Sequence, residues 1–155
     1  MGLRGMEIPS PVFREMCGEF TALHREAGKI RATWPLRDRY RGPTGVVQGG
    51  VVTALFDNTF GPLAYLSGEG FFVSLDLRTT FVRPLGPENR EVEIAAELVD
   101  RTRRFLILRG EALREDGSRA ALCETTMVEV EPGGRETDTA GRSPKANRDP
   151  KRSEP

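Results

Sequence analysis

A single acid stands inside an apolar stretch that directly follows a run of glycines. Asp57 is surrounded by Val52, Leu55, Phe56 and Phe60, at spacings typical of an apolar helix. Burying an ionised carboxylate without partners is costly. We therefore expect this carboxylate either to face a wet pocket, as a reactive group does, or to be held by an internal cap or ion pair.

The glycines supply a second chemical feature, an open start to this helix. Gly49 and Gly50 stand where the apolar spacing begins. The first N–H groups of a helix have no partner within it and lie at the positive end of its dipole. Glycine also lets a ligand approach the backbone closely. The pair therefore predicts a site for a ligand oxygen atom.

The spacing between these two features points to two chains. Gly49 and Asp57 are eight residues apart, which is a rise of about 12 Å along a helix, so they cannot touch one reacting carbon within one chain. If two such helices lie antiparallel across a two-fold axis, Gly49 of one chain comes near the partner's Asp57. The motif predicts a homodimer with two composite sites.

Two elements and a charged run are predicted before this helix. Ser10 and Pro11 predict the cap and first turn of an amphipathic helix that ends at the breaker Gly28, so residues 1–28 form an N-terminal helical segment. Residues 29–40 alternate like a half-exposed strand. A solvated charged face is predicted for Arg37, Asp38, Arg39 and Arg41.

After the helix ends near Gly68, the apolar period changes from 3.6 to 2. Strands are predicted over residues 71–81, 91–99, 104–113 and 119–130, with short connections that favour an antiparallel meander. The lone helix is best buried if this sheet curls around it. We predict an α+β domain over residues 29–131, with a central helix wrapped by about five to six strands, and a disordered tail over residues 132–155.

Composition narrows the function classes. The 155 residues carry 23 basic and 23 acidic side chains, so nothing global points to nucleic acid or to an anionic membrane. Cys17 and Cys123 are predicted to be buried, reduced thiols, and with the single His24 they give no framework for a metal or a His-based triad. No cofactor, signal segment or membrane span is predicted, which favours a cytoplasmic protein.

The motif residues resemble a known family. Gly45, Gly49, Gly50 and Asp57 have the spacing of the hotdog-fold acyl-CoA thioesterases, most closely the PaaI-type (phenylacetate-pathway) branch, and the V-S-x-D-L segment at Ser74 follows. The resemblance covers residues 40–130. It implies a hotdog fold, thioester hydrolysis and a homodimer that pairs again into a dimer of dimers.

The resemblance also implies roles for these residues. The Gly49 N–H would polarise the thioester carbonyl, and the partner's Asp57 would act as a general base on water or as a nucleophile. Ser74 would position the water or the carboxylate. Where the family usually has His and Asn, this chain has Gln48 and Gly42; Gln48 can still hold the loop or the thioester oxygen.

The Gly42 departure leaves two alternatives. Either turnover is slow, or the work of the missing Asn falls to Thr44 or Asn58. A non-catalytic hotdog module that binds acyl-CoA or a protein partner is the competing function.

We expect the substrate to be a small or medium acyl-CoA, and the acyl group could be aromatic. Small residues such as Gly50 and Gly61 either line an acyl tunnel or let two elements approach closely. For the CoA phosphates we predict contacts from arginines near strand ends, each of which could instead be a solvated turn residue: Arg83, Arg103 and Arg104.

Overall fold

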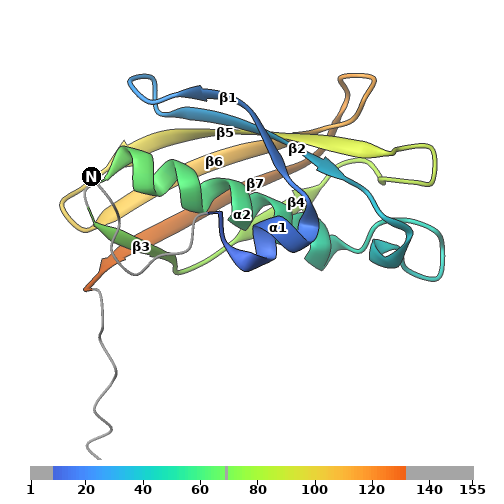
Figure 1. Ribbon diagram of the computed structural model, residues 1–155, viewed down its shortest axis with the longest axis horizontal. Helices are drawn as coiled ribbons and strands as arrows, with labels where there is room; N and C mark the ends of the chain where they lie inside the picture. The colour runs from blue at the N-terminus through green and yellow to red at the C-terminus, as the bar shows by residue number, and fades with distance from the viewer. Residues whose placement is uncertain (1–8, 69, 132–155) are drawn as a thin grey trace, which may run out of the picture.

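The computed structural model describes residues 9–68 and 70–131, so the predicted tail lies outside the described residues. A seven-stranded antiparallel sheet curls around one long helix, α2, which lies against its inner face (Figure 1). The elements are α1 (Pro11–Met16), β1 (Glu19–His24), β2 (Lys29–Pro35), the 3-10 helix η1 (Asp38–Tyr40), α2 (Gly49–Ser67), β3 (Phe71–Ser74), β4 (Arg78–Phe81), β5 (Glu91–Arg101), β6 (Phe105–Leu113) and β7 (Arg119–Val130).

The strands follow the order β1-β2-β5-β6-β7-β3, and β4 pairs with β7 beyond the end of β3. Every pairing is antiparallel. The predicted α+β hotdog fold, with a central helix wrapped by a curved antiparallel sheet, is therefore confirmed.

The core lies between α2 and the sheet. Phe56 and Phe60 are fully buried, and Gly110 on β6 makes room for them, because a Cβ atom there would lie 3.0–3.1 Å from both rings. Trp34 on β2 donates its indole N–H to Thr59 Oγ1 at 3.2 Å. Thr59 in turn donates to the Leu55 carbonyl at 2.9 Å, so both buried polar groups are satisfied.

The outer face of the sheet carries a row of alternating charges. Lys29, Glu97, Arg109, Glu124 and Arg78 stand opposite one another on five neighbouring strands. Glu97 pairs with Lys29 at 3.5 Å and with Arg109 at 2.5 Å, and Arg78 pairs with Glu124 at 3.5 Å. These side chains are exposed or half-exposed, so the row contributes little to stability pair by pair.

The N-terminal segment corrects one prediction. The Ser10 cap is present, because Ser10 Oγ accepts the Phe13 N–H at 3.2 Å, but α1 ends at Met16. Residues 19–24, predicted to be helical, form the edge strand β1 paired with β2. The close packing of Gly18 on the Trp34 ring and the turn at Gly28, with φ of +59°, make this pairing possible.

The two cysteines differ in burial. Cys123 is buried as predicted, whereas Cys17 is exposed because it caps the C-terminus of α1 in the left-handed region, with φ of 55°. Both are free thiols. The single histidine, His24, is exposed at the end of β1.

The long strand predicted over residues 71–81 is divided into β3 and β4. Asp76 lies in the break, where its carboxylate accepts the Thr126 N–H at 2.9 Å and its carbonyl accepts the Thr125 hydroxyl at 2.6 Å. The Leu75 N–H still donates to the Thr126 carbonyl at 2.8 Å, so the Asp76 side chain supplies the return bond that a strand carbonyl would otherwise make to β7. Val73 on β3 and Leu75 in the break are both exposed.

Candidate active site

Asp57 and Ser74 lie in direct contact within one chain. The Ser74 hydroxyl donates to Asp57 Oδ1 at 2.6 Å, from β3 to the middle of α2. Asp57 is half-buried, and among the described residues this hydroxyl is its only hydrogen-bond or ion-pair partner. A carboxylate accepts several hydrogen bonds, so most of its capacity is open.

Asp57 belongs to a stripe of α2 that faces β3 and β4. Gly49, Thr53 and Asp57 recur every four residues, which places them on one side of the helix. Thr53 donates to Thr79 Oγ1 at 2.9 Å, one turn before the Ser74 contact. The helix start and the acid therefore share one face, separated by a rise of about 12 Å.

The N-terminus of α2 is open. Gln48 occupies the cap position without a side-chain capping bond, and the Val51 and Val52 N–H groups bond to its carbonyl at 3.0 and 3.2 Å. In the described part of the chain the N–H groups of Gly49 and Gly50 donate to no acceptor. They are free to bind a ligand oxygen.

Phe81 borders this open end. A Cβ atom on Gly49 would lie 2.7 Å from Cζ of the Phe81 ring, so only glycine fits under the ring as it stands. A Cβ atom on Gly50 would meet no atom within 4 Å. The Phe81 ring therefore covers the helix start at Gly49, whereas the space beside Gly50 is open.

The two departures from the family pattern lie side by side. A Cβ atom at Gly42 would be 3.7 Å from Cγ and 3.9 Å from Nε2 of Gln48. The space that a side chain at position 42 would use therefore borders the exposed Gln48 amide.

The remaining predicted residues are spread over the surface of the domain. Thr44 is exposed in the loop before α2, and Gly61 has open space above it one turn after Asp57. Asn58 donates to the Ala54 carbonyl at 2.9 Å and lies 3.9 Å from the Met16 sulfur, so its amide is turned toward α1.

The predicted arginines do not form one patch within a chain. Arg83 follows β4, two residues after Phe81, which lies beside the start of α2. Arg103 and Arg104 lie in the β5–β6 turn, where the neighbouring Arg101 donates to the Ser67 carbonyl at the other end of α2. All three are exposed.

The charge of Asp57 reaches two other ionisable side chains. Burial raises the pKa of Tyr65, and the nearby Asp57 carboxylate raises it further. Burial also raises the pKa of the Cys123 thiol, with a smaller contribution from Asp57, against a hydrogen bond from Thr79 at 3.3 Å that lowers it. Cys123 is therefore a neutral thiol at neutral pH and a poor nucleophile.

Sequence reasoning did not assign a role in the site to Thr79, Phe81 or Arg41. Thr79 and Phe81 lie an odd number of residues after Ser74, so on the single strand predicted they would face the opposite side, and it is the break between β3 and β4 that brings all three to α2. Within residues 9–68 and 70–131 no group of three His, Cys, Asp or Glu side chains could hold a metal ion. No helix of this part of the chain is both long and apolar enough to cross a membrane.

Comparison with known families agrees with this geometry. The family model of the thioesterase superfamily matches residues 44–121, just over half of the chain. The chain therefore belongs to the thioesterase superfamily, and the predictions of a thioester hydrolase and of a PaaI-type hotdog resemblance are confirmed. No curated protein sequence matches the chain.

Solved structures give the same fold. A phenylacetic acid degradation-related protein from Ralstonia eutropha JMP134 is 28% identical, with a TM-score of 0.72 over 77% of this chain and 91% of its own. A point mutant of the phenylacetic acid degradation protein PaaI from Thermus thermophilus is also 28% identical, with a TM-score of 0.69 over 78% and 100%. A thioesterase from Haemophilus influenzae is 23% identical, with a TM-score of 0.72 over 83% and 88%, and shares the fold.

Proposed function

We propose that this protein hydrolyses small or medium acyl-CoA thioesters, aromatic acyl groups included, at two composite sites in a homodimer. The observation that carries the proposal is the half-buried Asp57, held by one hydroxyl on the same face of α2 as an open helix start. Two of the similar structures are named for phenylacetic acid degradation, which supports an aromatic acyl group.

In the proposed reaction the thioester carbonyl oxygen accepts the Gly49 N–H, which stabilises the negative charge that develops there. The partner's Asp57 takes a proton from water as the water oxygen bonds to the carbonyl carbon. The C–S bond then breaks, and the CoA thiolate takes up a proton. Alternatively the carboxylate attacks the carbonyl carbon directly and expels the CoA thiolate, which takes up a proton, and water then cleaves the resulting anhydride to release the acid and restore the Asp57 carboxylate. The Ser74 hydroxyl orients the carboxylate in both routes.

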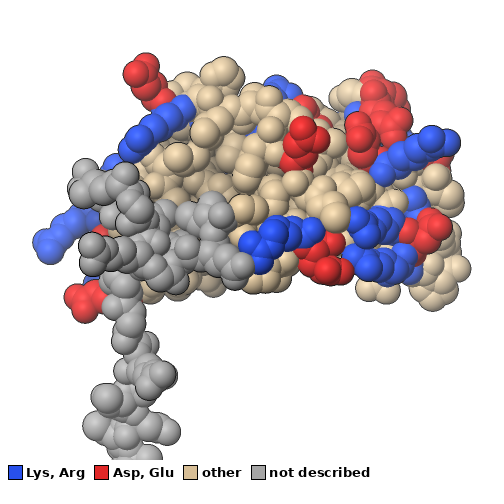
Figure 2. Space-filling view, viewed as in Figure 1, with Lys and Arg blue, Asp and Glu red and all other residues tan. Residues whose placement is uncertain are grey.

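The dimer is supported by an unpaired apolar edge beside the site. Val73, Leu75, Phe81 and Val82 on and beside β3 and β4 are 46–59% exposed, and both strands pair only with β7 in the described part of the chain. In Figure 2 the charged side chains on this face gather toward the right of the view, and the visible surface in its upper middle is mostly uncharged. An exposed apolar edge favours pairing with another chain. The dimer of dimers and the cytoplasmic location stay predictions from the sequence.

Hydrolysis is tested by thiol release from a panel of acyl-CoA esters that includes short aliphatic and aromatic acyl groups. We expect turnover by the wild-type protein and none by Asp57→Ala, with Asp100→Ala on the exposed end of β5 as the matched control. Unchanged turnover by Asp57→Ala would remove this carboxylate from the reaction.

The composite site is tested by complementation. Asp57→Ala and Gly49→Val are each inactive in the proposed site, but a heterodimer of the two contains one intact site. Co-expression at equal levels should recover about a quarter of wild-type activity, since half of the dimers have one of two sites intact. A co-expressed mixture as inactive as its parents would argue for a site within one chain.

The second candidate function is a non-catalytic acyl-CoA-binding module. It is favoured by Gln48 and Gly42, which replace the His and Asn usual in the family at the loop before α2. This function predicts saturable binding of acyl-CoA by calorimetry without release of free thiol over hours.

A further inference from the structure

The loop before α2 contains a largely buried cation that neither the sequence pattern nor the family resemblance assigned to the site. Arg41 was predicted to belong to a solvated face, yet its side chain is only 10% exposed. Its neighbour in the charged run, Asp38, is its ion-pair partner at 3.3 Å and is fully exposed. An exposed carboxylate neutralises a buried charge weakly, so other groups must solvate this guanidinium.

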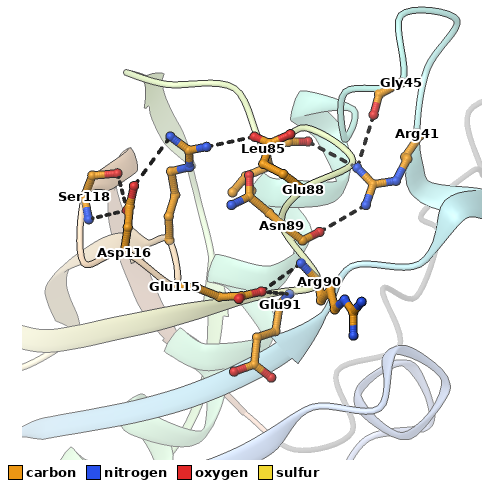
Figure 3. Close-up of polar contacts among 11 residues, drawn as sticks. Arg41, Gly45, Leu85, Glu88, Asn89, Arg90, Glu91, Glu115, Asp116 and Ser118 are labelled. Carbon is orange, nitrogen blue, oxygen red and sulfur yellow. Dashed lines mark hydrogen bonds and ion pairs between the residues drawn. The ribbon is translucent and has the colours of Figure 1, made fainter.

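Those groups are backbone carbonyls from three separate segments. Arg41 Nη1 donates to the Gly45 carbonyl at 3.1 Å and to the Leu85 carbonyl at 3.4 Å. Arg41 Nη2 donates to the Asn89 carbonyl at 3.1 Å and to the Leu36 carbonyl at 3.5 Å. Figure 3 shows the guanidinium between the Gly45 loop and the segment that carries Leu85 and Asn89. The planar fork therefore joins the loop to the end of β2 and to residues 85–89.

The segment on the far side of Arg41 is itself fixed. The Arg90 and Glu91 N–H groups donate to Glu115 Oε1 at 2.9 and 3.4 Å, and Glu88 pairs with Arg114 at 2.8 Å (Figure 3). These contacts anchor residues 85–91 to the β6–β7 hairpin. Arg41 thus ties the loop to a rigid part of the sheet.

The loop in turn sets the direction of the helix start. The Gly42 N–H bonds to the Val46 carbonyl at 2.8 Å, and the Gln48 N–H bonds to the Tyr40 carbonyl at 2.9 Å. Because Gln48 has no side-chain capping bond, the open N–H of Gly49 is oriented by the backbone of residues 40–48, which also bonds to the Leu85 carbonyl through the Val47 N–H at 3.0 Å. Any shift of this loop moves that N–H.

We propose that Arg41 is a positioning residue of the thioesterase site. It holds the 42–48 loop so that the Gly49 N–H points at the thioester carbonyl oxygen as charge develops there. The proposal rests on the function proposed above, and it assigns to Arg41 no contact with the substrate. A misplaced donor weakens transition-state stabilisation more than substrate binding, so the loss should fall on kcat.

The test compares Arg41→Met and Arg41→Lys with the control Arg31→Met, which removes an exposed arginine and its ion pair with Glu93. Arg41→Met should lower kcat by roughly 10- to 100-fold and change KM by less than about threefold, because a displacement of about 1 Å has effects of this size. Arg41→Lys keeps the charge and one donor group, and it should recover part of kcat. Arg31→Met should match the wild-type protein.

Hydrogen exchange supplies the second measurement. In Arg41→Met, exchange should rise more in residues 41–50 and 85–90 than in β5, β6 and β7, whose exchange should rise only by the common factor that a lower global stability produces. The proposal is overturned if kcat stays within about twofold of the wild-type value. It is also overturned if exchange rises evenly across the sheet, since Arg41 would then be a general stabiliser. If Arg41→Met does not fold, Arg41→Lys carries both measurements.

The two hypotheses fail differently. A wild-type protein that cleaves no thioester would overturn the proposed function. The exchange experiment would still decide whether Arg41 orders the loop, since a larger rise in the two segments supports this and an unchanged or even pattern overturns it.

Discussion

Arg41 and Asp57 are two charged side chains beside the same helix, and their surroundings are opposite. The Arg41 guanidinium has four carbonyls and one carboxylate around it, and it has little contact with solvent. The Asp57 carboxylate has one hydroxyl. A charge that holds structure has its hydrogen-bonding capacity filled, whereas a charge that performs chemistry must keep capacity for its substrate. By this comparison Arg41 has the surroundings of a structural ion, and Asp57 has the surroundings expected of the reactive carboxylate proposed above.

The largest effect is expected for Asp57→Asn. The amide keeps the shape of the side chain but cannot act as a base or nucleophile, so kcat should fall by about 1,000-fold or more. Because only one hydrogen bond holds Asp57, the free energy of unfolding should change by less than about 1.5 kcal/mol. Urea unfolding and thiol release measure the two quantities, and a large loss of stability would give Asp57 a structural role.

Arg41→Met should show the opposite pattern, a larger loss of stability and a smaller loss of kcat than Asp57→Asn. Four carbonyls lose a charged donor, so we expect the free energy of unfolding to fall by about 2–4 kcal/mol. Urea unfolding of Arg41→Met beside Arg31→Met measures this, since an exposed ion pair contributes only about 0–1 kcal/mol. Equal losses in the two variants would mean that burial of Arg41 has no energetic consequence.

Ser74→Ala tests the single partner of Asp57. A hydrogen bond to a charged group contributes about 1.5–3 kcal/mol. If losing it raises the activation free energy by that amount, kcat should fall by roughly 10- to 100-fold. Ser74→Thr keeps the hydroxyl and should recover part of the rate in the same assay. If Ser74→Ala retains full kcat, the contact does not orient the carboxylate during turnover.

Thr79→Val is expected to have a smaller effect. Thr79 joins Thr53 on α2 to Cys123 on β7, next to but outside the contact between Asp57 and Ser74. Its loss should lower the free energy of unfolding by about 1 kcal/mol and kcat by only about twofold. A loss of kcat as large as that of Ser74→Ala would extend the reactive arrangement one turn along α2.

The smallest effect is a shift in the pKa of Tyr65. The Asp57 carboxylate adds to the rise that burial produces, so Asp57→Asn should lower the pKa of Tyr65 while leaving it above the usual value for tyrosine. Absorbance of tyrosinate in an alkaline titration measures this, with Tyr40 as the other tyrosine of the chain. An unchanged midpoint would indicate that Asp57 carries no charge near this phenol.

The sequence was informative where one element determined the outcome. Helical spacing predicted one long helix from the glycine pair to near Gly68 with Asp57 in its middle, which the structure has as Gly49–Ser67, and the apolar pattern located the strands β5, β6 and β7. It was wrong for β1, because the apolar spacing of residues 19–24 fits a helix as well as an edge strand whose side chains stay largely exposed. The strand forms because the backbone of β2 supplies hydrogen-bond partners for residues 19–24.

Arg41 shows the remaining limit. Its acceptors belong to residues 36, 45, 85 and 89, and backbone carbonyls leave no trace in the residue types of those positions. A run of charges at 37–41 therefore resembles a solvated face, although the side chain of its last member, Arg41, is only 10% exposed. Only the fold brings these carbonyls to one point.

The row of alternating charges on the outer face also records the strand register. A slip by two residues keeps every apolar side chain on its own face, so burial alone distinguishes it poorly from the native pairing. If β6 slipped so that Glu111 took the place of Arg109, three glutamates, Glu97, Glu111 and Glu124, would stand side by side on neighbouring strands. Like charges directly opposite one another are destabilising, so the row identifies one alignment among those that bury the same core.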